Sequence, residues 1–223
     1  MLILALDTSG KTASCALAED GVLIAEVKQD TNLSHSRTLL PLCEKMLAEN
    51  NYKLSDIDLF AATSGPGSFT GLRIGIAAVK GFALMADKPC AGVPTLVSAA
   101  NGTEGNGVIC AAVRARADEF YCAFFERACG RLVRLTNDEV MSTEQILSEA
   151  QALEGRIRLC GEGSRELFDK APEGMFDFTD INQSAASTAL AAFFMPHTSC
   201  HDINPVYMKD SQAERMKKER QAK

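Results

Sequence analysis

The chain has 223 residues, of which 46% are hydrophobic and 23% are charged, which is ordinary for a soluble globular protein. A chain of this length buries roughly 70% of the surface that its unfolded form exposes, so it needs neither disulfides nor a metal to fold. The formal net charge is -6, which argues against a surface that binds nucleic acid directly, because phosphate binding requires a basic footprint.

The cysteines and the first residues bear on the cellular compartment. The chain has eight cysteines and no Cys-x-x-Cys pair, and most of them lie in apolar runs such as "VICAAV". This favours buried free thiols in a reducing compartment over disulfides or a zinc site. The start "MLILALDTSG" lacks the basic region of a signal peptide, and no stretch approaches the ~20 apolar residues of a membrane span. We therefore expect a cytoplasmic protein with no membrane partner.

The first half of the chain shows a hairpin signal followed by alternating strand and helix patterns. Asp20 and Gly21 form a dipeptide typical of a two-residue hairpin turn, between two runs with strand character. The helix that follows is expected to be capped by Ser34 and kinked at Pro41. We expect strands over 2–6, 12–20, 21–30, 57–65 and 88–93, and helices over 34–50 and 68–85.

The second half repeats this order more weakly, after a loop at 101–107, "NGTEGNG". We expect strands over 108–116, 119–127, 131–137 and 156–161, and helices over 143–153, 164–170 and 184–194. The actin-like ATPase (ribonuclease H-like) fold contains two copies of one order: three strands, a helix, a strand and a helix. We therefore predict an α/β protein of two small lobes, each with a mixed sheet flanked by helices. The expected division is 1–100, 101–208 and a charged C-terminal tail over 209–223.

The stretch "SGPGSFTGLRIG", residues 64–75, has the glycines and hydroxyls of a phosphate-binding loop. Ser68 is a candidate cap for the helix that follows, and the free N–H groups at a helix start favour anions. The Walker pattern is absent, because Gly71 is followed by Leu72 and Arg73 rather than by Lys and a hydroxyl residue. The stretch could thus bind a phosphate on physical grounds, but it carries no motif that is specific for a phosphate site.

The loop after the first strand, "DTSGK", belongs to the same question. An Asp at this position in active actin-like ATPases helps to place metal and phosphate, and a plain turn is the simpler interpretation of Asp, Ser and Gly. The candidate vestigial nucleotide loop comprises Asp7, Thr8, Ser9, Lys11, Gly65, Gly67 and Ser68.

The helix over 68–85 carries only two charges, Arg73 and Lys80, and it has two apolar faces. The bulky face suits the sheet and consists of Leu72, Ile76, Val79 and Ala83. The small face consists of Gly71, Gly75 and Ala78, which permit close approach of another backbone. Two interpretations of the small face stay open: packing against the helix over 34–50, or docking of a second subunit.

Several motifs together resemble the TsaB family, also called YeaZ. They are "LALDTSGKTASCAL", "SHSRTLLP", "SGPGSFTGLRIGIAAVKGFAL" followed by "GVPTL", and the late motif "NPVYMK". The resemblance is dense over residues 1–97 and thinner beyond. It implies a cytoplasmic bacterial protein of the actin-like fold that is required for making threonylcarbamoyladenosine beside the anticodon of tRNAs.

The resemblance implies a non-catalytic scaffold that docks a related catalytic subunit of the TsaD type. It also implies a TsaE-type ATPase in the complex, a homodimer through the same surface, and only indirect contact with tRNA. No cofactor is required by the chain itself, and ATP or ADP is a candidate ligand at the complex interface. The implied docking surface comprises Ser34, His35, Leu39, Leu40, Cys43, Gly71, Arg73, Ile74, Gly75 and Ala78.

Two departures from related sequences bear on chemistry. The catalytic relatives carry a metal-holding histidine cluster after the fifth strand, whereas this chain has no histidine there, so we expect neither a metal site nor catalysis. Family members often carry Asp-Ala-Arg on the first strand of the second lobe, and here Arg114 replaces that Asp. The alternative hypothesis is an actin-fold ATPase or phosphotransferase that is active alone and uses Asp7 and the loop from Gly65 to Gly71. A peptidase is remote, since no Ser/His/Asp arrangement is evident.

Overall fold

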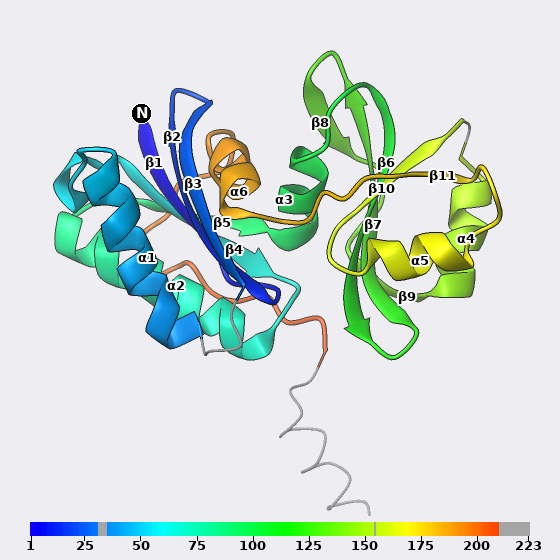
Figure 1. The fold of residues 1–223 in the computed structure, drawn as a ribbon, viewed down its shortest axis with the longest axis horizontal. Coiled ribbons are helices and arrows are strands. Elements are labelled where there is room, and N and C mark those ends of the chain that lie inside the picture. Colours follow the sequence, from blue (N-terminus) through cyan, green and yellow to red (C-terminus); the bar gives the residue numbers. More distant parts are fainter. Residues whose placement is uncertain (31–34, 154, 210–223) are drawn as a thin grey trace, which may run out of the picture.

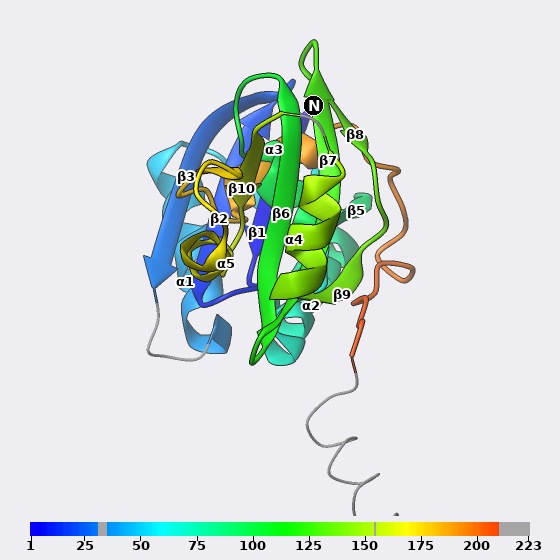
Figure 2. The ribbon, with the colours of Figure 1, turned by 90° about the vertical axis from the view of Figure 1, so that its right-hand side faces the viewer.

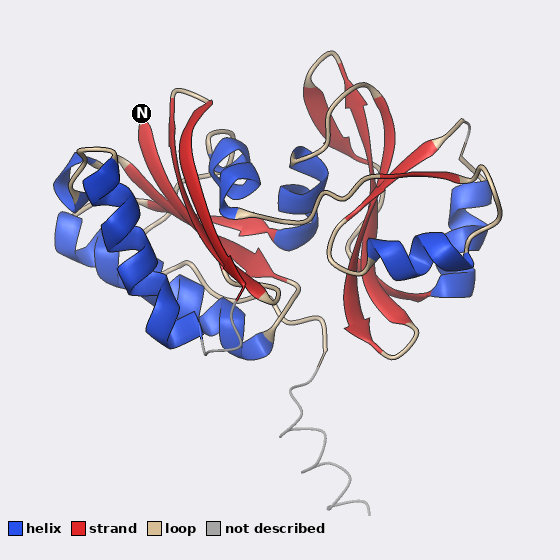
Figure 3. Cartoon of the chain, viewed as in Figure 1, coloured by secondary structure: helices blue, strands red, loops and turns tan. Residues whose placement is uncertain are grey.

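The computed structural model describes residues 1–30, 35–153 and 155–209, and it consists of two lobes that each contain a mixed sheet (Figures 1 and 3). The first sheet has the order β3-β2-β1-β4-β5, in which β1 pairs antiparallel with β2 and parallel with β4. Its strands are β1 (Leu2–Asp7), β2 (Thr12–Glu19), β3 (Val22–Asp30), β4 (Leu59–Gly65) and β5 (Cys90–Pro94). The predicted hairpin is present, because Glu19 pairs with Val22 across a turn in which Asp20 and Gly21 have positive φ.

The second sheet repeats the first, which confirms the predicted duplication. Its order is β11-β10-β6-β7-β8, and β9 pairs with the other end of β7. Its strands are β6 (Gly107–Arg116), β7 (Glu119–Ala128), β8 (Arg131–Arg134), β9 (Glu139–Ser142), β10 (Ile157–Cys160) and β11 (Phe176–Phe178). The third strand, predicted over 131–137, ends at Arg134 as β8, and β9 was not predicted. The three-residue β11 was not predicted, because it is too short to show an alternating pattern.

The helices form three layers around the two sheets. They are α1 (His35–Glu49), α2 (Phe69–Ala86), α3 (Thr95–Asn101), α4 (Thr143–Gln151), α5 (Ser164–Lys170) and α6 (Ala185–Ala192), and a 3₁₀ turn covers Leu54–Asp56. Helices α1 and α2 cover the outer face of the first sheet, α3 and α6 lie between the sheets, and α4 and α5 cover the outer face of the second (Figures 1 and 2). Helix α3 was not predicted.

The two lobes exchange segments, so the predicted division near residue 100 does not follow the packing. Helix α6 comes late in the sequence but packs on the first sheet, through Ala185 and Ala189 among others. Helix α3 comes earlier but packs on the second sheet, through Leu96 and Ala99. The chain then returns to the first lobe, where the Val206 N–H donates to the carbonyl of Ser64 at 2.7 Å.

One face of helix α2 packs on the first sheet. Leu72, Ile76, Val79 and Ala83 are all buried against the sheet, as the spacing predicted. By length and composition α2 is also apolar enough to cross a membrane, so the expectation that no stretch reaches this range does not hold for α2. Core helices of soluble proteins meet the same criterion, and one face of α2 is buried in the first lobe. All eight cysteines are free and six of them are buried, as predicted.

Candidate functional site

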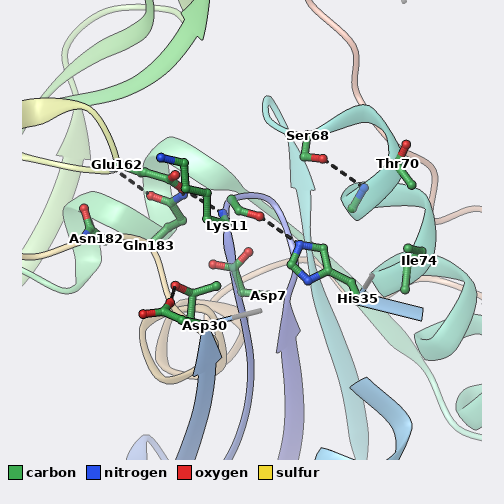
Figure 4. A pocket seen from close by; sticks show the side chains of 13 residues that line it. Asp7, Lys11, Asp30, His35, Ser68, Thr70, Ile74, Glu162, Asn182 and Gln183 are labelled. Atoms are coloured by element: carbon green, nitrogen blue, oxygen red, sulfur yellow. Dashed lines mark hydrogen bonds between the residues drawn. The ribbon is translucent and has the colours of Figure 1, made fainter. Parts of the chain in front are cut away.

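A cleft of about 680 Å³ lies between the lobes, where the turn after β1 meets the starts of α1 and α2 and two loops of the second lobe. Figure 4 shows Lys11 and His35 from the first lobe and Glu162 and Gln183 from the second lobe converging on this space. Of the candidate nucleotide loop, Asp7, Lys11 and Ser68 line this cleft. Ser9 and Gly67 line a smaller pocket that shares Lys11 and Ser68 with it, and Thr8 and Gly65 line neither.

Asp7 ends β1 and is almost fully buried, with 2% of its surface exposed. Its Oδ1 accepts a hydrogen bond from the Ser9 N–H at 2.8 Å and another from the Thr63 hydroxyl at 2.8 Å. Burial raises the pKa of the Asp7 carboxyl, and the hydrogen bonds from Ser9 and Thr63 oppose that rise. Asp7 therefore connects the turn after β1 to β4, because it accepts a hydrogen bond from each of them.

The glycine-rich stretch packs tightly on the turn after β1. Ser68 caps α2 by accepting the Gly71 N–H at 3.2 Å, as predicted. The Ser68 N–H donates to the Ser9 carbonyl at 2.7 Å, and a Cβ at Gly67 would lie 2.7 Å from that same carbonyl oxygen. The Thr8 hydroxyl donates to the Gly71 carbonyl at 2.7 Å. The contacts of these glycines are thus within the chain.

Gly65 supports the return of the C-terminal segment. Its φ of +123° lies in the region that favours glycine, and a Cβ there would collide with the Val206 carbonyl. The stretch at 64–75, which includes the start of α2, therefore contacts two segments that are distant in sequence: the turn after β1 and the segment at 203–207.

The predicted docking residues divide into buried and accessible groups. Leu39 and Cys43 are 1% and 2% exposed and belong to the core between α1, α2 and the first sheet, and Gly71 and Gly75 are also buried. Half-buried residues are Ile74, Ala78 and His35, whose Nε2 donates to the Gly10 carbonyl at 3.0 Å. The accessible members are Leu40 and Arg73. Ser34 lies outside the described residues.

The outward face of α1 and α2 includes further residues that sequence reasoning missed. Leu84 and Met85 are 66% and 70% exposed, Leu40 is 51% exposed, and Ala77 and Gly81 are also exposed. We call these residues, together with Arg73, the α1–α2 face. Ala77 and Gly81 follow Arg73 at four-residue spacing, so all three lie on the same side of α2. The charge of Arg73 was therefore the signal in the sequence that this side of α2 faces outward.

Three comparisons connect this structure to known proteins. A family model described as TsaD, tRNA N6-adenosine threonylcarbamoyltransferase, matches residues 26–216. The tRNA threonylcarbamoyladenosine biosynthesis protein TsaB of Escherichia coli (strain K12) is 36% identical over 167 residues, which cover 73% of this chain and 72% of that protein. The chain belongs to the TsaB family. Members of this family take part in the biosynthesis of tRNA threonylcarbamoyladenosine.

Solved structures agree with membership in the TsaB family and with the predicted actin-like fold. The structure titled YeaZ from Pseudomonas aeruginosa has a TM-score of 0.79 at 25% identity and covers 93% of this chain and 99% of its own. The component A of (R)-2-hydroxyglutaryl-CoA dehydratase from Acidaminococcus fermentans has a TM-score of 0.52 at 11% identity, with 86% and 98% coverage. At that identity the second likeness shows the fold alone.

The late motif of this TsaB-family chain, "NPVYMK", packs against the start of α2. The Tyr207 ring stacks on Phe69 with centroids 4.3 Å apart, and the Arg73 Nε donates to the Tyr207 hydroxyl at 2.8 Å. The Arg73 guanidinium also lies over the Phe69 ring at 4.0 Å. Tyr207 thus fixes the C-terminal segment beside the α1–α2 face.

Arg114 lies on β6 and lines a smaller pocket that shares Gly10, Lys11 and Glu162 with the cleft. Its guanidinium forms an ion pair with Glu166 of α5 and donates to the Ala117 carbonyl at 3.2 Å. The arginine is therefore held within the second lobe. Among the residues that the structure describes, no three or more His, Cys, Asp or Glu side chains gather where they could hold a metal ion.

Proposed function

We propose that this chain is a non-catalytic scaffold subunit in tRNA threonylcarbamoyladenosine biosynthesis, and that it docks and activates a TsaD-type catalytic subunit through the α1–α2 face. The proposal extends the pathway that the TsaB-family relatives share. The observation that carries it is the apolar character of an exposed helix pair. The match to the TsaD family model supports a relation between the two families, and the partner itself is our proposal.

The α1–α2 face has the composition of a docking surface. Leu84 and Met85 are large apolar side chains that water contacts over most of their area, and Leu40 adds a third from α1. Large apolar side chains that stay exposed favour a partner that removes them from water, and an arginine such as Arg73 is a residue type enriched at the energetic centre of interfaces. The same face would join two copies of this chain when the partner is absent.

The state of Asp7 supports a scaffold role over catalysis by this chain. An ATPase of this fold needs an ionised carboxylate that is free to meet metal and phosphate. Here the carboxyl is buried, burial raises its pKa, and its Oδ1 accepts from both Ser9 and Thr63. We therefore infer that the chain requires no cofactor of its own, and that ATP or ADP is held at the interface with the partner.

The remaining parts of the assembly are proposed from the family. A TsaE-type ATPase joins the complex, and tRNA contacts the partner rather than this acidic chain, whose net charge is -6. The complex acts in the cytoplasm, and the exposed apolar face of α2 meets protein rather than a membrane.

Light scattering coupled to size-exclusion chromatography tests the docking, with the chain alone and then with the organism's TsaD-type protein, with and without ATP. Leu84→Glu adds a charge to the α1–α2 face at a side chain that is 66% exposed, so the monomer should fold while self-association and partner binding weaken. Phe194→Glu is the matched control, because Phe194 is 82% exposed and follows α6, outside the α1–α2 face. Equal binding by both variants and the native chain would refute the proposed surface.

A further inference from the structure

One side chain crosses the cleft and joins the lobes through the turn after β1. Glu162 lies in the loop between β10 and α5, and its Oε2 accepts the backbone N–H of Lys11 at 3.2 Å, although the two residues are 151 apart in sequence. Figure 4 shows the Glu162 carboxylate directed from the second lobe toward Lys11. The carboxylate therefore already occupies the position in front of this N–H group.

Gly10 provides the room that this carboxylate needs. A Cβ built at residue 10 would collide with the Glu162 Oε2 and would lie 2.9 Å from the Gln183 Nε2. The backbone of Gly10 is not among the positive-φ positions, so an alanine can adopt the same conformation there. The absence of a side chain at residue 10 thus permits a close approach of an anionic group to the turn.

Gln183 holds the carboxylate in place from its own lobe. Its Nε2 donates to the Glu162 Oε2 at 3.4 Å, and its Oε1 accepts the Glu162 N–H at 3.2 Å. The Glu162 carbonyl in turn accepts the Arg114 N–H at 2.7 Å, which ties the loop to β6. Contacts to both its side chain and its backbone therefore fix Glu162 in the orientation that reaches Lys11.

Chemically, the turn after β1 presents an anion seat. It offers a backbone N–H beside a residue without a side chain, next to the positive charge of Lys11, and such turns accept phosphate or carboxylate oxygens. A carboxylate that sits in this seat supplies the acceptor oxygen itself. It also repels a second anion across a few ångströms. Asp30, on the same cleft wall, adds further negative charge.

We propose that the Glu162 carboxylate is a built-in occupant of the anion seat formed by Gly10 and Lys11, and that it excludes phosphate-bearing ligands from the cleft. Glu162 is thus the residue that determines which anionic ligands are excluded from the cleft. It also holds the lobes together at this point. The proposal concerns the isolated chain and does not depend on docking through the α1–α2 face, so either can fail without the other.

Two single variants from opposite lobes test the proposal. Glu162→Ala removes the carboxylate, and Gly10→Ala leaves it present but displaces it with a methyl group. Glu173→Ala is the control, since Glu173 is an exposed glutamate of the same lobe and does not line the cleft. The two readouts are calorimetric binding of inorganic pyrophosphate to the full chain and the NMR-detected exchange rate of the Lys11 amide without ligand.

We expect Glu162→Ala to bind pyrophosphate at least about tenfold more tightly than the native chain, a difference of about 1.4 kcal/mol. Gly10→Ala should show a smaller gain, because the displaced charge stays nearby. Both variants should exchange the Lys11 amide faster, and Glu173→Ala should change neither readout. The double variant should gain no more than Glu162→Ala alone, since both changes empty the same seat.

Either of two results would overturn the proposal. Unchanged exchange of the Lys11 amide in both cleft variants would show that the carboxylate does not occupy the seat in solution. Faster exchange without tighter pyrophosphate binding would show that the carboxylate occupies the seat but is not what excludes phosphate. If Glu162→Ala does not fold, Gly10→Ala decides the matter alone, because it preserves every polar partner of Glu162.

Discussion

Gly75 packs directly against Thr8, because a Cβ at residue 75 would lie only 2.5 Å from the Thr8 Oγ1. The same hydroxyl donates to the Gly71 carbonyl at 2.7 Å. The small-residue face of α2 thus meets the turn after β1 of its own chain, an arrangement that neither of the two sequence interpretations named. Gly75→Glu would therefore disturb the fold, so it cannot serve as a test of docking by an intact monomer.

The first prediction is that Gly75→Ala destabilises the chain. The added methyl group gains helix propensity, about 1 kcal/mol at most, but it overpacks a site that holds the Thr8 hydroxyl. Overpacking typically costs about 1–3 kcal/mol. We therefore expect a net decrease in the free energy of unfolding, measured by equilibrium urea denaturation.

Gly81→Ala is the matched control on the same helix. Among the described residues, nothing beyond the chain neighbours of Gly81 and the backbone of its own helix lies within 4 Å of the position of a Cβ at residue 81. The substitution should therefore stabilise the chain by roughly 0.5–1 kcal/mol. If Gly75→Ala stabilised the chain as much as Gly81→Ala does, the packing of Thr8 on α2 would be looser than the structure shows.

Local signals in the sequence predicted most of the elements. The Asp20-Gly21 turn, the cap at Ser68 and the buried spacing along α2 each depend on residues close together in the chain, and all three are present. The duplicated order of strands and helices was sufficient to predict the actin-like fold. The helix α3 was missed, because "GVPTLVSAAN" has no polar face that would mark a helix.

The parts that sequence could not predict depend on contacts between distant segments. The exchange of α3 and α6 between lobes is stabilised by a buried hydroxyl contact, with the Ser98 Oγ 2.8 Å from the Thr188 Oγ1. The contact between Glu162 and Lys11 likewise joins segments on different lobes. An isolated serine or glutamate has no local sequence pattern that predicts its distant partner, so these contacts become visible only in the folded structure.

The second prediction concerns the pH dependence that Asp7 gives to stability. Its pKa in the folded chain is raised above the ordinary value of 3.8, chiefly by burial. Between 3.8 and the raised pKa the folded state binds more protons than the unfolded state, so the contribution of Asp7 to stability falls as pH rises through that window. Asp7→Asn does not titrate, and its carbonyl oxygen can accept from both Ser9 and Thr63.

We therefore expect Asp7→Asn to be at least as stable as the native chain near neutral pH. The difference in unfolding free energy between the two should grow from about pH 4 upward and then level off above the folded pKa. Urea denaturation across this range measures it. A variant less stable than the native chain at neutral pH would mean that the ionised carboxylate is favoured in the fold, which would revive a nucleotide-binding role for Asp7.

The third prediction concerns the attachment of the C-terminal segment to α2. Tyr207 stacks on Phe69 and accepts a hydrogen bond from Arg73, and its neighbour Val206 bonds the Ser64 carbonyl. Tyr207→Ala removes both side-chain contacts and should lower the unfolding free energy by about 1–2 kcal/mol. Tyr207→Phe keeps the stacked ring and should cost no more than about 1 kcal/mol.

Two measurements distinguish this attachment from a general loss of stability. Amide exchange at Val206 should accelerate in Tyr207→Ala more than in Tyr207→Phe, because only the first variant frees the segment from α2. Phe194→Ala, at an aromatic residue that is 82% exposed, should leave both Val206 exchange and stability within about 0.5 kcal/mol of the native values. Equal exchange at Val206 in the native chain and Tyr207→Ala would contradict the attachment, since the stacked ring would then not hold the segment on the first lobe.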